Sequence, residues 1–562
     1  MLIEGGLTAI AIAVAFCWPR LGSRYFSSVE NLFRTLARRK GYAVLVVGAS
    51  ALLLRLALLP LCPVPNPFIP NDFSFLLAAD TFASGRLTNP TPAMWTHFES
   101  IHITMKPTYM SMYFPAQGLV LAAGRVLLGH PWYGVLCASA LMCAAICWML
   151  QAWLPPTWAL LGGMLAVLRL GLFSYWINTY SGGGSIAALG GALLLGGFPR
   201  FMRTLHLRDA ILLAAGVVLL AATRPYEGAL LCIPVIIALG RWLFFGEKRP
   251  SPVVIARSVA IPLAMIIAAA AWMGYYNYRA FGNPIIPAYS INRATYAMAP
   301  YFVWQSRRPE PVYRHAAMRR FYYEKELIDY EKIHSLPGFL PRSSFKVLTA
   351  FAFFAGIALL PPLIMLPRVF MDRRPRFLLL CLLVLMGGMI IEIFLVPHYL
   401  APFTSVFYAI GLQAMRHLRV WSPGRQPVGL EIVRLIVLLC VVLVGIRAWA
   451  IPLHLRLSEW PVSQWIDNWY GPAQFGGERA HVASKLGELP GKQLVIVRYS
   501  PDHNPYDEWV YNSADIDSSK VIWARDMDAA SDLELMKYYK DRKVWLVQPD
   551  TQPAEISPYT TR

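Results

Sequence analysis

Long apolar runs separated by short polar connections make up most of the first 450 residues. The first clear run, residues 41–62, is long enough to cross a hydrocarbon core of about 30 Å. The later runs of the same character are 132–150, 157–173, 185–197, 210–222, 228–245, 253–273, 345–366, 377–396, 399–415 and 431–449. We predict that they form helices in the membrane, which gives an all-α polytopic protein with about 11–13 transmembrane helices.

Two long polar stretches, residues 63–131 and 274–344, interrupt this pattern. Within the first, residues 116–128 are apolar but short and contain Arg125, so we predict an amphipathic helix that lies in the membrane interface without crossing. The apolar residues 2–18 contain Glu4 and lack a basic start. They are better explained as an extra span or an anchor than as a cleaved signal peptide.

The chain becomes polar after Trp449. The segments QLVIVRYS, VIWARDM and KVWLVQPD are typical of strands, and SDLELMKYYK, between the last two, is typical of a helix. We therefore divide the chain into an N-terminal apolar segment with a basic linker (1–40), a transmembrane domain (41–450) and a small α/β domain (451–562).

Composition and charge agree with a membrane protein. The chain is 56% hydrophobic and 15% charged, and its mean hydropathy is +0.45. Its net charge of +19 arises largely from Lys and Arg in short connections near residues 200–208, 241–249, 368–376 and 416–425, which we place on the cytoplasmic side. Both long polar stretches and the C-terminal domain then lie outside. We find no nucleic-acid-binding motif, and the eight cysteines show no zinc-site spacing.

Candidate chemistry begins directly after the first span. Asp72 is predicted at the N-cap of an amphipathic helix, where a partly desolvated carboxylate could act as general base for an acceptor hydroxyl. The alternative is a helix cap without catalytic role. Asp80 lies two helical turns further on, and Glu99 with His97 and His102 could supply a second acid or bind a divalent metal. Polar groups on a hydrated loop are the alternative for these four residues.

A second group of ionisable residues lies between later apolar runs. In the short turn TRPYEG, Arg224 could bind a phosphate, or it could merely form a local ion pair with Glu227. By the predicted topology, His398 and Tyr399 lie on the same external face. Polar clusters at the ends of spans favour an anionic lipid-linked substrate, whereas a transporter would place polar residues near the middle of its spans.

Three segments, NDFSFLLAADTFASGRL, YFPAQGLVLAAGRVLLGHPWYGVL and PHYLAP, resemble the GT-C superfamily of polytopic glycosyltransferases. The resemblance is to the family-39-like group, which includes protein O-mannosyltransferases and aminoarabinose transferases, and it extends over about residues 41–415. It implies sugar transfer from a polyprenyl-phosphate donor outside a bacterial inner membrane. The family usually has two adjacent acids where this chain has Asp72 followed by Phe73. Whether a divalent metal is used therefore stays open.

The sequence thus predicts a glycosyltransferase in which Asp72 is the base, while Arg224 with Lys106 or His398 neutralises the departing phosphate. The sugar and the acceptor are not identified. A lipid or polysaccharide transporter or flippase is the alternative, and it would tolerate Asp72→Asn. A membrane-anchored scaffold whose C-terminal domain binds a partner is a third possibility, although it leaves the polar residues of 63–131 unexplained.

Overall fold

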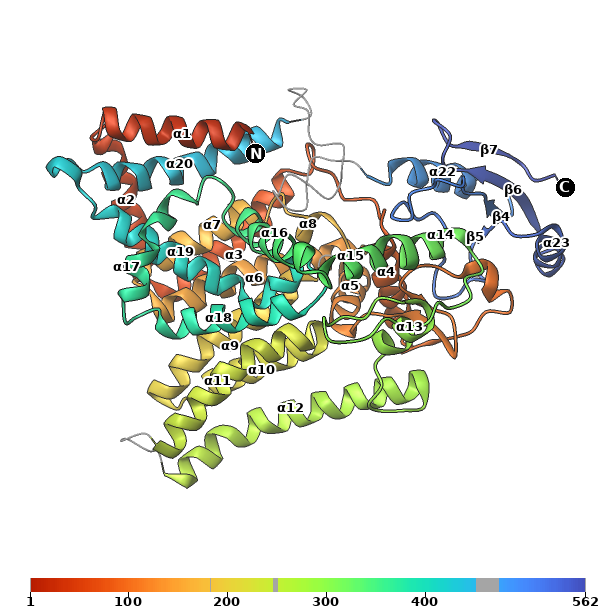
Figure 1. The fold of residues 1–562 in the computed structure, drawn as a ribbon, viewed down its shortest axis with the longest axis horizontal. Coiled ribbons are helices and arrows are strands. Elements are labelled where there is room, and N and C mark those ends of the chain that lie inside the picture. The colour runs from red at the N-terminus through yellow and green to blue at the C-terminus, as the bar shows by residue number, and fades with distance from the viewer. Residues whose placement is uncertain (1, 182, 246–250, 451–474, 561–562) are drawn as a thin grey trace.

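Helices make up most of the computed structural model, which describes residues 2–181, 183–245, 251–450 and 475–560 (Figure 1). Six helices are long and apolar enough to cross a membrane: α3 (Lys40–Ala57), α6 (Pro131–Trp153), α9 (Gly184–Thr204), α11 (Pro225–Phe245), α12 (Pro252–Phe281) and α20 (Val428–Ala448). A bent pair of segments, Pro361–Met371 and α18 (Arg376–Ile391), gives up to seven. The chain is an integral membrane protein.

The other predicted apolar runs are also helical for most of their length. They form α7 (Pro156–Leu170), α10 (Leu207–Thr223), α16 (Leu336–Phe354), η3 (Pro361–Met365), α17 (Leu366–Met371), η4 (Pro397–Phe403) and α19 (Thr404–Arg419). Short helices α2 (Ser23–Arg38), α8 (Tyr175–Asn178) and η5 (Pro423–Arg425) connect them. The predicted fold class, helical with a small C-terminal α/β part, is confirmed. The number of crossings stays a prediction.

The N-terminal helix α1 (Leu2–Cys17) lies alongside α20 (Figure 1). Its acid Glu4 is buried, accepts a hydrogen bond from the Ala358 backbone at 3.2 Å, and lies 3.4 Å from Nη1 of Arg169 on α7. A buried carboxylate is stable only with such partners. These contacts attach α1 to the helical bundle.

The apolar segment in the first polar stretch forms α5 (Pro115–Leu128), which packs on α6 through glycines. A Cβ on Gly124 would lie 2.3 Å from the Gly134 nitrogen, so only glycine permits this approach. Its 14 residues span roughly 21 Å, less than a hydrocarbon core. Its place in the membrane interface stays a prediction.

The rest of the first polar stretch contains α4 (Pro70–Ala83), η1 (Trp95–Phe98) and a small antiparallel sheet in the order β1 (Asn89–Pro90), β3 (Thr108–Ser111), β2 (Ile103–Thr104). The prediction that Asp72 is an N-cap is wrong. Helix α4 begins at Pro70 with Ile69 as its N-cap, because proline's fixed φ suits the first helical position. Asp72 therefore lies within the first turn.

The second polar stretch is partly helical. Helix α12 extends into it as far as Phe281, and α13 (Ala288–Tyr296), α14 (Ala316–Arg319), the π-helical η2 (Arg320–Glu326) and α15 (Leu327–Ile333) follow. The side chain of Arg293 on α13 donates to both carboxylate oxygens of Glu326 at 2.7 and 2.6 Å. Both bonds come from the same nitrogen, Nη1, and this buried charge-assisted pair joins α13 to η2.

The C-terminal part contains α22 (Gly477–Glu488), β4 (Lys492–Val497), β5 (Val521–Arg525), α23 (Ala529–Tyr538), β6 (Arg542–Gln548) and β7 (Glu555–Pro558). The three predicted strands and the helix between the last two are confirmed. The strand order is β5-β4-β6-β7, parallel except for β7. Apolar residues of the sheet, among them Leu494 and Ile522, pack with Leu77 and Phe98 of the first polar stretch. Residues 451–474 of the predicted domain lie outside the described residues.

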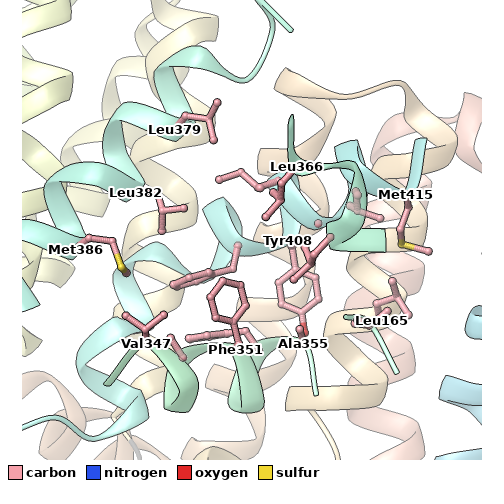
Figure 2. Close-up of a pocket in the computed structure, with 18 of the residues that line it drawn as sticks. Leu165, Val347, Phe351, Ala355, Leu366, Leu379, Leu382, Met386, Tyr408 and Met415 are labelled. Atoms are coloured by element: carbon pink, nitrogen blue, oxygen red, sulfur yellow. The ribbon is translucent and has the colours of Figure 1, made fainter. Parts of the chain in front are cut away.

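An apolar pocket of about 190 Å³ lies between α16, α18 and α19. Figure 2 shows Phe351, Leu382, Met386 and Met415 around it, and Tyr408 supplies a hydroxyl that has no hydrogen-bond partner among the described residues. Such a lining accommodates hydrocarbon and offers no charged group for catalysis. The polar chemistry of the chain therefore has to be sought elsewhere.

Candidate functional site

A polar cavity of about 220 Å³ lies where α10 and α11 meet the two long polar stretches. Its charged lining residues are Arg224, Glu227 and Glu392. Its tyrosines come from five different segments and are Tyr113, Tyr226, Tyr289, Tyr301 and Tyr399. The cavity thus combines one guanidinium with a wall of aromatic rings and hydroxyl groups.

Arg224 is held at a sharp junction between two apolar helices. Helix α10 ends at Thr223 and α11 begins at Pro225, so Arg224 alone connects them. Its guanidinium carbon lies 4.3 Å from the centre of the Tyr399 ring. Its Nη1 lies 3.9 Å from Glu227 Oε1, which is too long for a hydrogen bond. The predicted ion pair with Glu227 is therefore loose, and the main contact of Arg224 is the tyrosine face.

Glu392, which received no role in the sequence analysis, also lines the cavity. Helix α18 ends at Ile391, and the chain then pairs with the second polar stretch through a bridge between Phe302 and Glu392. An acid inside the apolar run 377–396 is a signal that could have identified it, because ionisable residues in such runs usually serve a function.

The second polar stretch supplies much of the aromatic wall. Tyr289 lies on α13, and its ring stacks on that of Tyr301 with centroids 5.0 Å apart. The guanidinium of Arg293 lies 4.8 Å from the Tyr301 ring. The sequence analysis assigned these tyrosines no role, because no local motif indicates that residues 289–301 fold back onto the helix ends.

Asp72 does not line the cavity; it lies behind its wall. Its Oδ1 accepts hydrogen bonds from the backbone N–H groups of Tyr180 at 3.0 Å and Ser181 at 2.8 Å, and its Oδ2 accepts one from Phe68 at 3.3 Å. Gln117, which does line the cavity, donates to the Tyr180 carbonyl at 2.7 Å. Burial raises the pKa of Asp72 to about 6, although these hydrogen bonds lower it.

The predicted phosphate ligands His398 and Lys106 do not line the cavity. His398 is buried with its Nδ1 2.8 Å from the hydroxyl of Tyr175, and burial lowers its pKa well below the usual value. A neutral imidazole adds no positive charge at pH 7. Lys106 is exposed, and its ammonium lies 4.3 Å from the centre of the Trp95 ring. Of the predicted group, Arg224, Glu227 and Tyr399 are brought together.

The supporting residues predicted in the first polar stretch all have structural partners. Asp80 pairs with Arg125 and accepts from the Ala514 backbone at 2.7 Å. Nε2 of His97 lies 3.4 Å from a carboxylate oxygen of Asp532. These contacts link the first polar stretch to the C-terminal sheet rather than to the cavity.

Glu99 and His102 complete this group. Glu99 accepts from the Tyr296 hydroxyl at 2.9 Å and lies 3.4 Å from Nη1 of Arg314. His102 lies with Nδ1 3.1 Å from the hydroxyl of Tyr113, and burial lowers its pKa to about 3. Within the described part of the chain, no group of three or more His, Cys, Asp or Glu side chains could hold a metal ion.

Comparison with known proteins gives structural likenesses only. No protein-family model matches the sequence, and no curated protein matches it. ArnT from Cupriavidus metallidurans in the apo state shares 14% identity at a TM-score of 0.48, over 90% of this chain and 92% of that chain. The same protein bound to undecaprenyl phosphate shares 13% identity at a TM-score of 0.46, over 90% and 92% of the two chains.

The oligosaccharyltransferase of Archaeoglobus fulgidus, in complex with Zn and sulfate, shares 10% identity at a TM-score of 0.45, over 90% of this chain and 67% of that chain. Likenesses of this size carry neither an activity nor a substrate over to this chain.

Proposed function

We propose that this chain is an integral membrane glycosyltransferase that moves a sugar from a polyprenyl-phosphate-linked donor to an acceptor hydroxyl on the non-cytoplasmic face of a bacterial inner membrane. The observation that carries the proposal is the position of Arg224. Its guanidinium lines a tyrosine-walled cavity at the junction of two apolar helices. A donor can place its phosphate there while its hydrocarbon tail stays between the helices and lipid.

The cavity suits the sugar and phosphate of such a donor. Its volume of about 220 Å³ lies below the roughly 300–1,000 Å³ of sites for drug-sized ligands, so a single sugar ring suits it better than a large ligand. Aromatic rings can pack against the apolar face of a sugar, and tyrosine hydroxyls can donate to or accept from its hydroxyls. This lining therefore favours a carbohydrate over a purely apolar ligand.

Arg224 stabilises the leaving group in this proposal. As the bond between the anomeric carbon and the phosphate oxygen breaks, its electron pair moves to the phosphate and negative charge grows there. A planar guanidinium can bind two phosphate oxygens at once.

Asp72 is the proposed base. The acceptor oxygen forms the new bond to the anomeric carbon, and its proton moves to the Asp72 carboxylate. A pKa of about 6 leaves this group mostly ionised at neutral pH and still basic enough to take a proton. The proposal requires the acceptor to approach beside the backbone of Tyr180 and Ser181, whose N–H groups now bind Oδ1.

Replacement of Arg224 by lysine tests the proposal in a transfer assay with a polyprenyl-phosphate-linked sugar. We expect Arg224→Lys to fold and insert but to lower turnover roughly 10- to 1,000-fold, because lysine lacks the planar fork. Arg200→Lys is the matched control: its guanidinium lies 4.1 Å from the Trp148 ring, away from the cavity. Unchanged turnover in Arg224→Lys would refute the phosphate role. Lipid movement without sugar transfer by the wild type would favour the transporter.

A further inference from the structure

A second polar crevice lies outside the apolar helices, between the C-terminal sheet and the segments α14 and η2. Its volume is about 440 Å³. Five arginines line it: Arg314, Arg319, Arg320, Arg498 and Arg525. The carboxylates that line it are Glu324 and Asp526. The lining of the crevice therefore carries an excess of positive charge.

The crevice lies at a particular edge of the sheet. Strand β4 is central, and the chain passes from it to β5 on one side and then to β6 on the other. In open parallel sheets, ligands bind beyond the carboxyl ends of the strands at the point where the strand order reverses. Arg498 and Tyr499 directly follow β4, and Arg525 ends β5. The crevice thus lies at the carboxyl ends of the adjacent strands β4 and β5, of which β4 borders the reversal point between β4 and β6.

Arg525 is buried and incompletely satisfied. Only 2% of it is exposed, its Nε donates to the Glu99 carbonyl at 2.6 Å, and its Nη2 donates to Glu508 at 2.7 Å. Its Nη1 is buried without a hydrogen-bond partner among the described residues, and Arg525 is one of the residues that line the crevice. Buried donors in native proteins are usually paired. An oxygen atom of a ligand would supply the hydrogen-bond acceptor that Nη1 lacks.

The other arginines are partly neutralised and still offer donors. Arg498 forms two hydrogen bonds with Asp526, at 2.8 and 3.0 Å. Arg320 donates to the His503 carbonyl at 2.9 Å, and its Nε lies 3.5 Å from Glu324. The carboxylates of Glu99 and Glu508, which neutralise Arg314 and Arg525, are themselves buried behind the lining. Arg319 pairs with Glu310 at 3.1 Å, so each of the five arginines has a carboxylate partner. A guanidinium group carries five N–H donors, so these pairs leave donors over for a ligand.

We propose that this crevice binds a saccharide that carries a phosphate or a carboxylate group. Guanidinium forks match both kinds of anion. The volume exceeds what a lone anion needs and falls in the range of small-ligand sites. The Tyr499 ring, stacked on His503 with centroids 3.9 Å apart, supplies a flat surface for a sugar ring. This inference goes beyond the proposed transfer reaction, because the crevice is separate from the cavity around Arg224.

Calorimetric titration of the purified full-length protein tests this inference. The probes are glucose 1-phosphate, glucuronic acid, neutral glucose and inorganic phosphate. We expect saturable binding of glucose 1-phosphate or glucuronic acid and no binding of glucose. The sugar that binds with the higher affinity identifies the anionic group that the crevice prefers. Arg498→Gln and Arg320→Gln should each weaken that binding roughly tenfold or more, the usual effect of losing one charge-assisted hydrogen bond.

Arg307→Gln is the matched control, since Arg307 lies in the same polar stretch, pairs with Glu331 at 3.5 Å and does not line the crevice. The affinity of Arg307→Gln for the anionic sugar should equal that of the wild type. The inference is overturned if neither anionic sugar binds, if inorganic phosphate binds as tightly as the sugars, or if Arg307→Gln loses as much affinity as Arg498→Gln.

Discussion

Polar residues of the first polar stretch and polar residues around the cavity differ in what they contact. Asp80, His97 and Glu99 are each engaged by other parts of the chain. Arg224 and Glu392 instead line an open volume, and the Nη1 of Arg224 lies 3.9 Å from Glu227 Oε1, too far for a hydrogen bond. Asp80, His97, Glu99 and Arg224 were all candidate functional residues in the sequence, whereas Glu392 was not. The comparison indicates that charged side chains lining a cavity are better candidates for chemistry than titratable side chains that mainly contact other parts of the chain.

The difference has a structural cause. The C-terminal domain packs against the first polar stretch. The Ala514 backbone N–H donates a hydrogen bond to Asp80, and the Ser100 hydroxyl donates one to Glu508 at 3.1 Å. Buried polar groups at such an interface must be paired, and the charged residues of the stretch supply the partners. The cavity has no such interface to satisfy.

Asp72 tests this distinction most severely. Its carboxylate accepts three backbone hydrogen bonds, as a structural residue would, and it is nevertheless the proposed base. We expect Asp72→Asn to lower turnover roughly 10²- to 10⁴-fold, the usual contribution of a general base. The asparagine oxygen can still accept from Tyr180 and Ser181, so the protein should remain folded. Transfer assays with thermal-unfolding controls measure both effects. If Asp72→Asn has the turnover of the wild type, Asp72 has a structural role only. The base would then have to be sought among the carboxylates that line the cavity, Glu227 and Glu392.

Glu99 should behave in the opposite way. In Glu99→Leu, the Tyr296 hydroxyl and the Arg314 guanidinium lose their acceptor, so we expect a loss of about 1–3 kcal/mol in the free energy of unfolding. Turnover per folded molecule should stay near the wild-type value. Glu310→Leu removes an exposed partner of Arg319 and should cost less than about 1 kcal/mol. Equal stability losses in the two variants, or lost turnover in folded Glu99→Leu, would contradict the distinction.

The dependence of kcat/KM on pH is a third and smaller expected effect. With the pKa of Asp72 at about 6, kcat/KM should be about tenfold lower at pH 5 than at pH 7 and level above that. The raised pKa also means that the folded protein binds this proton more tightly than the unfolded chain. Asp72 therefore contributes a loss of stability as the pH rises from its usual pKa to about 6. A rate that is flat down to pH 5 would exclude Asp72 as the base.

Lys106 should matter least. Its ammonium packs on Trp95 in an exposed position outside the cavity, so Lys106→Gln should change stability by about 0.5–1 kcal/mol. Turnover should change less than about twofold, within the small effects of surface substitutions. A loss as large as that of Arg224→Lys would mean that the first polar stretch closes over the cavity during transfer.

Local pattern was enough to predict the helices, the three strands and the position of Arg224 and Tyr399 at the same end of the bundle. Hydropathy and alternation report on burial within one element, and short turns fix which helix ends face each other. The aromatic wall was not predicted, because Tyr289 and Tyr301 reach it only after a long segment folds back. Asp72 was predicted to lie just after the first span. The backbone groups around its carboxylate were not predicted, because its hydrogen bonds to residues 180–181 depend on tertiary packing.

The central claim, that Arg224 receives the donor phosphate, is tested most directly by an experimental structure of the full chain with a polyprenyl phosphate bound. The account predicts phosphate oxygens at about 2.7–2.9 Å from the Arg224 guanidinium, within the tyrosine-walled cavity. A phosphate bound at Lys106, or in the crevice beside Arg525 with the cavity around Arg224 empty, would contradict it.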